Sequence, residues 1–285
     1  MIKLAAFAKI NLALQVIGKR EDNYHEIDSI MQSVSLFDEI TITHTDPGIE
    51  IISNDSSLPR DSKNTAYKAA MVFFDKTGVR PDALIDIKKN IPVAAGLAGG
   101  SADAAAVLFG LNQIYKTGLT ESDLSVLGAE VGSDVPFCLT GGLCRCRGRG
   151  ELIEKIPPRS DRGQIPTWYV LVKPDFEVST KWVYDNFDLV WILEHRLVGT
   201  HIPLSSITLF NDLEKVVLPK YPEVQNIKKR LIQLGCLQAV MSGSGPTVFG
   251  LAPDFNTAQK IYNEMKTKYQ QTYLVEPVSS GIEIL

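Results

Sequence analysis

The sequence predicts an α+β protein, and three features lead to that class. Its 285 residues include 45% hydrophobic and 22% charged residues, which is ordinary for a globular chain with a sizeable core. Strand-like and helix-like stretches come in runs, without the regular alternation of a doubly wound parallel sheet. A stretch rich in proline and charge, PPRSDRGQIP at 157–166, predicts a break between a domain at 1–158 and a second domain at 159–285.

The first half is expected to begin with strands. Alternating apolar residues predict a strand at 4–17, and similar runs lie at 33–44 and 83–91. Between the last two, alanines at helical spacing predict a helix at 63–77 that stops at Gly78.

Two more helices are expected after these strands. A glycine-rich turn leads into a helix at roughly 101–115. Another helix begins at Thr120, where Asp123 completes a capping-box pattern, and it ends near Gly132. We expect a loop at 133–137 and strand structure at 141–156, where Cys144 and Cys146 point to one face.

The second half predicts a mixed domain. Residues 186–210 carry no readable pattern, whereas 221–235 has clear helical spacing, with Pro222 in the first turn and Gly235 at the stop. The other expected elements are a strand at 167–173, a helix from Ser179, a strand at 237–241, a loop at 242–247, a strand at 248–251, a helix at 256–269 and a strand at 272–278.

Charge and composition exclude several classes of protein. A net charge of −4 argues against a nucleic-acid binder that depends on a basic surface, although it leaves small anionic ligands open. No apolar run approaches a membrane span, and Lys9 and Asn11 interrupt the only stretch that resembles a signal peptide, so we expect a cytoplasmic protein. The four cysteines lack Cys-x-x-Cys spacing and are expected to be buried, reduced thiols rather than metal ligands.

The stretch GLAGGS at 96–101 is the first candidate for chemistry. It is neither a Walker A loop nor a dinucleotide fingerprint. Its glycines permit positive φ, and the helix that follows offers unpaired N–H groups and a dipole that favours an anion. From the residues alone, a tight strand-to-helix turn and a phosphate cradle remain equally open. SGSGPT at 242–247 is a second such loop, and it too could be a plain β-turn.

Lys9 and Asp134 are the second candidate. Lys9 and Asn11 project from the same face of one strand, beside Phe7 and Ala13, which suggests a partly covered surface rather than a solvated lysine. Asp134 follows a helix end and could simply cap or turn the chain. Near a phosphate loop, however, a carboxylate could accept a hydroxyl proton while an ammonium stabilises developing charge.

Tyr24 and His25 form an adjacent pair after a polar turn. A lone histidine or tyrosine is more often structural. An adjacent pair in a loop can instead stack on a flat ring and form a hydrogen bond to it.

Together these motifs resemble the GHMP small-molecule kinases. The resemblance rests on AKINLAL (8–14), IPVAAGLAGGSADAAAVL (91–108) and MSGSGPTVFGL (241–251). Four further motifs are similar to the members that phosphorylate the 2-hydroxyl of a cytidine-diphosphate-linked sugar alcohol in the non-mevalonate route to isoprenoids: DNYHEI (22–27), EVGSDVPF (130–137), RGRGE (147–151) and NDLE (211–214). The seven motifs occur in the expected order, and the resemblance as a whole covers the chain from about residue 3 to residue 252.

The resemblance implies both architecture and site. It implies an N-terminal domain like the second domain of ribosomal protein S5 and a ferredoxin-like C-terminal domain. By position, Lys9 and Asp134 fall on the catalytic pair, with Asp134 as the base. The implied ATP site comprises Pro92, Val93, Ala94, Ala95, Gly96, Leu97, Ala98, Gly99, Gly100, Ser101 and Ala102, with Lys89 and Asn64 near the adenosine. The implied substrate site comprises Asn11, Tyr24, His25, Tyr184, Gly243 and Ser244, with Tyr24 and Tyr184 on either side of the cytosine.

Departures from the family pattern are few. Asn23 stands where glycine is common, and both residue types tolerate the left-handed conformation. Ala95 and Ala98 replace glycines and Ala102 replaces a serine, so Gly96, Gly99 and Gly100 alone are expected to supply special φ values.

ATP transfer implies Mg²⁺, which we expect phosphates and water to hold, because no carboxylate cage is visible. The expected partner is a small molecule, with no nucleic acid or membrane, and the chain is expected to be a monomer or a weak homodimer. Two rivals remain: the same fold acting on mevalonate or homoserine-type alcohols, and a nucleotide-binding regulator without catalysis.

Overall fold

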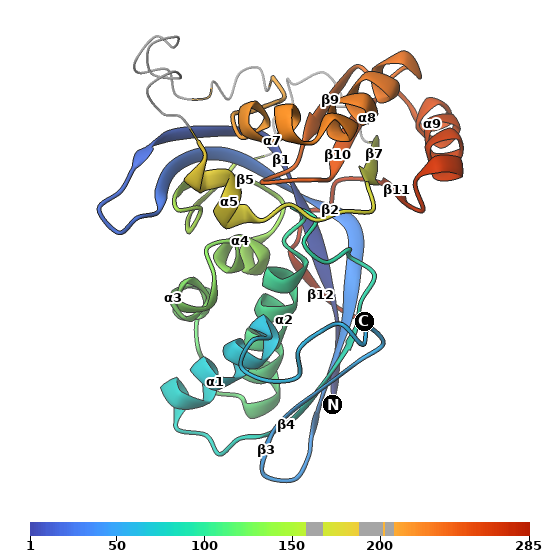
Figure 1. Ribbon diagram of the computed structural model, residues 1–285. Coiled ribbons are helices and arrows are strands. Elements are labelled where there is room, and N and C mark those ends of the chain that lie inside the picture. Colours follow the sequence, from blue (N-terminus) through green and yellow to red (C-terminus); the bar gives the residue numbers. More distant parts are fainter. Residues whose placement is uncertain (158–167, 188–201, 203–207) are drawn as a thin grey trace.

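Two β-sheets organise the chain in the computed structural model, which describes residues 1–157, 168–187, 202 and 208–285 (Figure 1). The larger sheet is built mainly from the N-terminal half, and helices α1 to α4 gather beside it. The smaller sheet belongs to the C-terminal half, with helices α8 and α9 beside it. This arrangement confirms the predicted α+β class.

The larger sheet is centred on a long antiparallel pair, β1 (Ile2–Lys19) and β2 (His25–His44). Its main path runs β12-β1-β2-β4-β3, while β5 pairs with β2, β6 with β5 and β8 with β1. The added strands are β3 (Gly48–Ser53), β4 (Asp82–Lys88), β5 (Leu143–Gly148), β6 (Leu152–Lys155), β8 (Phe210–Asn211) and β12 (Ile282–Ile284).

Strand β1 is covered on both faces. The predicted partly covered face is more deeply buried than expected, since Lys9 and Asn11 are both buried. Irregularities in the β1–β2 pairing, at Phe7/Ala8 and Asn11/Ala13, bracket these two residues. Bulges of this kind re-aim side chains, and they are frequent beside functional sites.

Four helices pack beside the larger sheet: α1 (Thr65–Thr77), α2 (Gly99–Tyr115), α3 (Glu121–Val131) and α4 (Val135–Thr140). The predicted stop at Gly78 is confirmed by its φ of 68°, and the predicted capping box at Thr120 is present. The predicted loop at 133–137 is wrong in part, because α4 begins at Val135 with Pro136 in its first turn, a position where proline needs no N–H partner.

The alanine-rich sequence of α2 has a packing reason. Most of the helix is buried, and a Cβ at Gly110 would lie 2.6 Å from Ile42 Cδ1 on β2. Small side chains therefore let α2 approach the sheet closely and hold its N-terminus in a fixed place.

The smaller sheet has the order β11-β7-β10-β9, with every neighbouring pair antiparallel. That order is the expected ferredoxin-like arrangement. Its strands and helices are β7 (Trp168–Lys173), α5 (Thr180–Asp185), α7 (Glu214–Lys220), α8 (Pro222–Gln233), β9 (Gln238–Met241), β10 (Val248–Ala252), α9 (Phe255–Lys268) and β11 (Gln271–Val275).

The proposed division at residue 158 lies outside the described residues, as does most of the unreadable segment 186–210. The two halves are not independent in the larger sheet. Strands β8 and β12, both from the second half, pair with β1.

All four cysteines are buried and unpaired, as predicted. Burial raises the pKa of the Cys236 thiol to about 12 and that of Cys144 to about 11, so both stay protonated at neutral pH.

Candidate active site

A cavity of about 1160 Å³ lies between the two halves of the chain. Its lining comes from β1, the turn before β2, the start of α2, the residue before α4, the start of α5 and the loop after β9. A cavity for one small ligand usually measures about 300–1,000 Å³. The volume of this cavity lies above that range.

The first glycine loop enters the cavity through an unusual backbone. Gly96 has a positive φ of 74°, as predicted, but the other left-handed residues here are Ala94 and Ala98, with φ of 50° and 58°. Gly99 and Gly100 form the first turn of α2 instead, so the prediction that they supply special φ values is wrong. Close packing explains why both positions lack a side chain. A Cβ at Gly99 would lie 3.0 Å from Ile91 Cγ2, and a Cβ at Gly100 would lie 2.9 Å from Thr65 Oγ1.

The N-terminus of α2 lies at the cavity. Ala98 precedes the helix and supplies no side-chain cap, while Gly99, Gly100 and Ser101 line the cavity. Uncapped N–H groups and the positive end of a 17-residue helix dipole form a site suited to phosphate.

The two glycine loops touch each other. Ser242 Oγ donates to the carbonyl of Gly96 at 2.9 Å, and a Cβ at Gly96 would lie 2.2 Å from the carbonyl oxygen of Ser242. Glycine at position 96 is therefore required both by its φ and by this close approach.

Lys9 and Asp134 meet at the same cavity. Lys9 Nζ lies 2.7 Å from Asn11 Oδ1, to which it donates, and 3.5 Å from Asp134 Oδ2. The Lys9 side chain is only 5% exposed, whereas that of Asp134 is 30% exposed and makes no capping bond to α4. The carboxylate is thus held by a buried cation and open to a ligand.

Backbone and amide contacts fix this pair. The Lys9 N–H donates to the carbonyl of Leu97 at 3.1 Å, which joins β1 to the first glycine loop. Asn11 Nδ2 donates to Ser29 Oγ at 2.9 Å, which leaves Asn11 Oδ1 directed at the ammonium.

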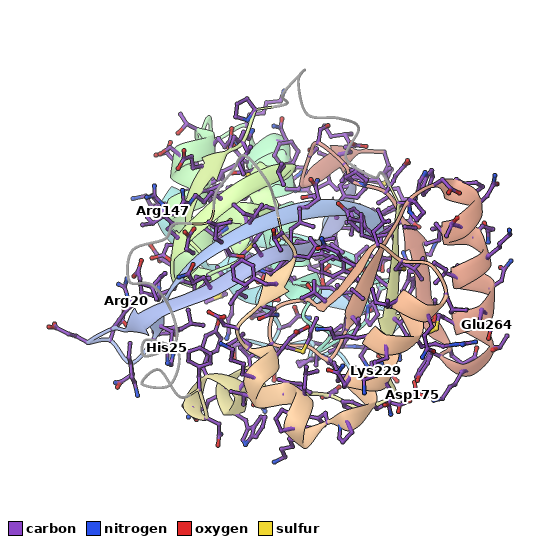
Figure 2. The ribbon with its side chains drawn as sticks, turned by 90° about the horizontal axis from the view of Figure 1, so that it is seen from above. Arg20, His25, Arg147, Asp175, Lys229 and Glu264 are labelled. Carbon is purple, nitrogen blue, oxygen red and sulfur yellow. The ribbon has the colours of Figure 1, made fainter. Side chains whose placement is uncertain are left out.

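The other end of the cavity holds aromatic rings. His25 and Tyr184 face each other with centroids 5.0 Å apart and an interplanar angle of 31°. Tyr24 is 53% exposed, and Arg149 Cζ lies 4.9 Å from its ring centroid. Figure 2 shows His25 near Arg20, close to the turn that joins β1 and β2.

The turn and the histidine follow from simple rules. Asn23 has φ of 66°, the left-handed conformation expected for it, and Asp22 Oδ1 accepts from the N–H of Tyr24. Burial, and then the charge of Lys19, lower the pKa of His25, so its imidazole is neutral at pH 7.

Lys89 and Asn64 are not among the residues that line the cavity, and their expected place near the adenosine stays a prediction. Asn64 caps α1 through Ala66 N–H and donates to the carbonyl of Pro59. Lys89 is buried between Asp38 and Asp103. Both side chains are therefore occupied by structural contacts.

Several other predicted positions can be placed. Asn11, Gly243 and Ser244 line the cavity, as do Ala94 and Ala98. Of the remaining loop residues, Ala95, Leu97 and Ala102 are buried in the core, and Pro92 and Val93 lie outside the lining. Sequence reasoning missed Arg149, for which the motif RGRGE was the only signal.

Comparison with family models identifies the class. The model "GHMP kinases N terminal domain" matches residues 64–142, and "GHMP kinases C terminal" matches residues 193–271. The chain belongs to the GHMP kinase family, and it is an ATP-dependent small-molecule kinase.

Individual relatives narrow the class. The 4-diphosphocytidyl-2-C-methyl-D-erythritol kinase of Clostridium tetani is 41% identical over 97% of this chain and 100% of its own length. The enzyme of the same name from Clostridium kluyveri is 45% identical over 96% and 99%.

Solved structures agree with these relatives. A crystal structure of 4-(cytidine 5'-diphospho)-2C-methyl-D-erythritol kinase matches with a TM-score of 0.81 and 28% identity, over 97% of this chain and 99% of that one. Homoserine kinase from Cytophaga hutchinsonii has a TM-score of 0.73 at 23% identity, over 100% and 97%, and it shares the fold. In the part of the chain described here, no helix has the length and apolar character that a bilayer crossing requires.

Proposed function

We propose that this chain transfers the γ-phosphoryl group of ATP to the 2-hydroxyl of 4-diphosphocytidyl-2-C-methyl-D-erythritol, a step of non-mevalonate isoprenoid synthesis. One observation carries the proposal. A single cavity joins the open N-terminus of α2, the Lys9–Asp134 pair and the rings of Tyr24, His25 and Tyr184. A phosphate donor, a reacting hydroxyl and a flat base each have a matching surface, and the named relatives act on such a substrate.

Asp134 acts as the general base. Its carboxylate accepts the hydroxyl proton as the alcohol oxygen bonds to the γ-phosphorus and the bond from that phosphorus to the β–γ bridging oxygen breaks, which leaves ADP. Lys9, 3.5 Å away, offsets the repulsion between the carboxylate and the incoming phosphoryl group.

The start of α2 holds the donor. Backbone N–H groups at Gly99 to Ser101 face the phosphates, and their position is fixed before ATP arrives by the Lys9–Leu97 backbone bond. Mg²⁺ bound with ATP would neutralise charge on the phosphates. We expect the phosphates of the nucleotide and water to hold the ion.

The aromatic end reads the cytosine. Tyr24 and Tyr184 present rings on which the base can stack, and the neutral imidazole of His25 offers it a hydrogen bond. Mevalonate and homoserine have no ring to fill this end, so the cytidyl substrate fits the whole cavity better.

An ADP-release assay tests the proposal. We expect turnover with the cytidyl substrate and little with mevalonate or homoserine. Asp134→Asn should lower kcat by roughly 10²- to 10⁴-fold and leave ATP binding nearly intact. The matched control is Asp86→Asn, an exposed aspartate on β4, which should behave like the wild type. Unchanged turnover in Asp134→Asn contradicts the role of the base, and a preference for mevalonate or homoserine contradicts the substrate.

A further inference from the structure

The motif NDLE at 211–214 has no part in the site described so far, yet its side chains hold the loop that touches Lys9. Asn211 ends β8, which pairs with β1 at Leu14. Its side chain is buried, and the loop in question, Ser242 to Gly245, follows β9 about thirty residues later in the chain.

The amide of Asn211 is fully used. Nδ2 donates to the carbonyls of Met241 at 2.8 Å and Gly243 at 2.7 Å, and Oδ1 accepts from the N–H of Leu213 at 2.9 Å. Only one orientation of the amide satisfies all three bonds, since a flipped amide would set its oxygen against two carbonyls. One side chain thereby fixes the last carbonyl of β9 and a carbonyl of the loop that follows it.

Neighbouring residues of the motif extend the contact. Glu214 Oε1 accepts from the N–H of Met241 at 2.8 Å, while its Oε2 lies 2.5 Å from Lys228 Nζ. Asp212 Oδ2 accepts from the N–H of Val16 on β1 at 3.0 Å. The motif therefore ties the loop to the same strand that carries Lys9 and Asn11.

The loop held in this way lies against the reacting groups. A Cβ at Gly243 would lie 3.4 Å from Lys9 Nζ, 3.4 Å from Asn11 Oδ1 and 3.2 Å from the carbonyl oxygen of Gly96. Gly243, Ser244 and Gly245 all line the cavity, and Ser244 Oγ is 2.7 Å from Thr180 Oγ1 of α5. A small shift of this loop would change the space beside the ammonium.

We propose that Asn211 is a positioning residue that fixes the loop 242–245 over Lys9 and so sets where the sugar-alcohol end of the acceptor lies. This inference rests on the proposed function. Asn211 lies outside the cavity, yet it places the acceptor. The donor is placed by α2 and by the Lys9–Leu97 backbone bond.

The test is Asn211→Asp, which keeps the shape but retains at most one of the two donors. A displacement of about 1 Å can cost roughly 10²-fold, so we expect kcat/KM for the cytidyl substrate to fall by about that factor. The KM for that substrate should rise, and the KM for ATP should stay within about threefold, a split that a general loss of structure would not produce. Asn226→Asp is the matched control, because Asn226 is exposed on α8 and its side chain donates to Glu223 at the surface.

Each outcome decides the inference. Wild-type-like kinetics in a folded Asn211→Asp variant, or an equal rise of both KM values, overturn it. If that variant does not fold, Asn211→Ser, which keeps one donor, takes its place: an intermediate acceptor-specific loss supports the inference, and wild-type kinetics overturn it. If neither the wild type nor Asn226→Asp phosphorylates the cytidyl substrate, the proposed function itself is contradicted.

Discussion

Asp103→Asn tests the buried charge cluster beneath the phosphate loop. Lys89 Nζ contacts Asp38 Oδ2 and lies 2.8 Å from Asp103 Oδ2, and all three side chains are nearly inaccessible. One cation faces two buried carboxylates. Asp38 also accepts from the N–H groups of Asn90 and Ile91, at 2.6 and 2.9 Å, whereas Asp103 Oδ1 has no hydrogen-bond partner among the described residues. Asp103 is therefore the carboxyl that keeps a proton.

The direction of the pH effect follows. Burial, reinforced by the charge of Asp38, raises the pKa of Asp103 from 3.8 to about 8, against the opposing effect of Lys89. Between these values the folded state holds a proton that the unfolded state has released. Stability from this group is complete below pH 3.8 and is lost as the pH rises through 8.

The magnitude follows from the same pKa. Each pH unit in this window costs about 1.4 kcal/mol, and the group is half ionised near pH 8, so the wild type should lose about 2 kcal/mol from this source between pH 6 and 8. The amide introduced by Asp103→Asn cannot ionise. The stability of this variant relative to the wild type should therefore increase by about 2 kcal/mol over that interval.

Urea unfolding at pH 6, 7 and 8 measures this difference for Asp103→Asn and for the exposed control Asp86→Asn. A constant difference between Asp103→Asn and the wild type at all three pH values would refute the reasoning, because it would mean that Asp103 does not lose its proton in this interval. The reasoning would also be refuted if, with rising pH, the free energy of unfolding of Asp86→Asn increased relative to the wild type as much as that of Asp103→Asn.

Two further predictions concern the loop and the ring pocket. Gly96→Ala should destabilise the chain by about 1–3 kcal/mol and raise the KM for ATP, since its Cβ would meet the Ser242 carbonyl at 2.2 Å. Gly118→Ala is the control in thermal melting: its φ of 71° is similar, but nothing lies within 4 Å, so equal losses would contradict the steric cause. His25→Ala should raise the KM for the cytidyl substrate about tenfold or more and leave that for ATP unchanged, with His44→Ala as control. An equal rise in the KM for ATP would contradict the placement of His25 at the cytosine end.

Local signals were enough for much of the fold. The stop at Gly78, the capping box at Thr120 and the two long strands depend on residues adjacent in sequence, and the structure contains all of them. The second strand, however, begins at His25, which was expected in a loop, rather than at residue 33. Helix α4 was missed because proline in its first turn looks the same as proline in a loop. Strand β12 was missed because three residues carry no period, and its partner β1 lies at the other end of the chain.

The site residues also differ in whether local sequence or only the fold identifies their contacts. Lys9, Asn11 and Asp134 could be predicted because strand alternation and the motifs name them, and they do meet. Lys89 could not be placed, since its partners Asp38 and Asp103 are 51 and 14 residues away and only the fold brings them together. The prediction for Gly99 and Gly100 failed for a physical reason: the sequence shows a missing side chain but not whether φ or space requires it.

Strand β1 explains why donor and acceptor ends remain aligned. At Lys9 its backbone holds the first glycine loop, and at Asn11 its N–H donates to Ser242 Oγ of the second. At Leu14 and Val16 it binds β8 and Asp212, which carry the motif that fixes the second loop. Both loops are hydrogen-bonded to one strand, so a distortion of β1 moves them together. Loss of the Asn211 side chain moves only the second loop. Alignment of the two reacting groups therefore depends less on how the halves meet than on what is attached to β1.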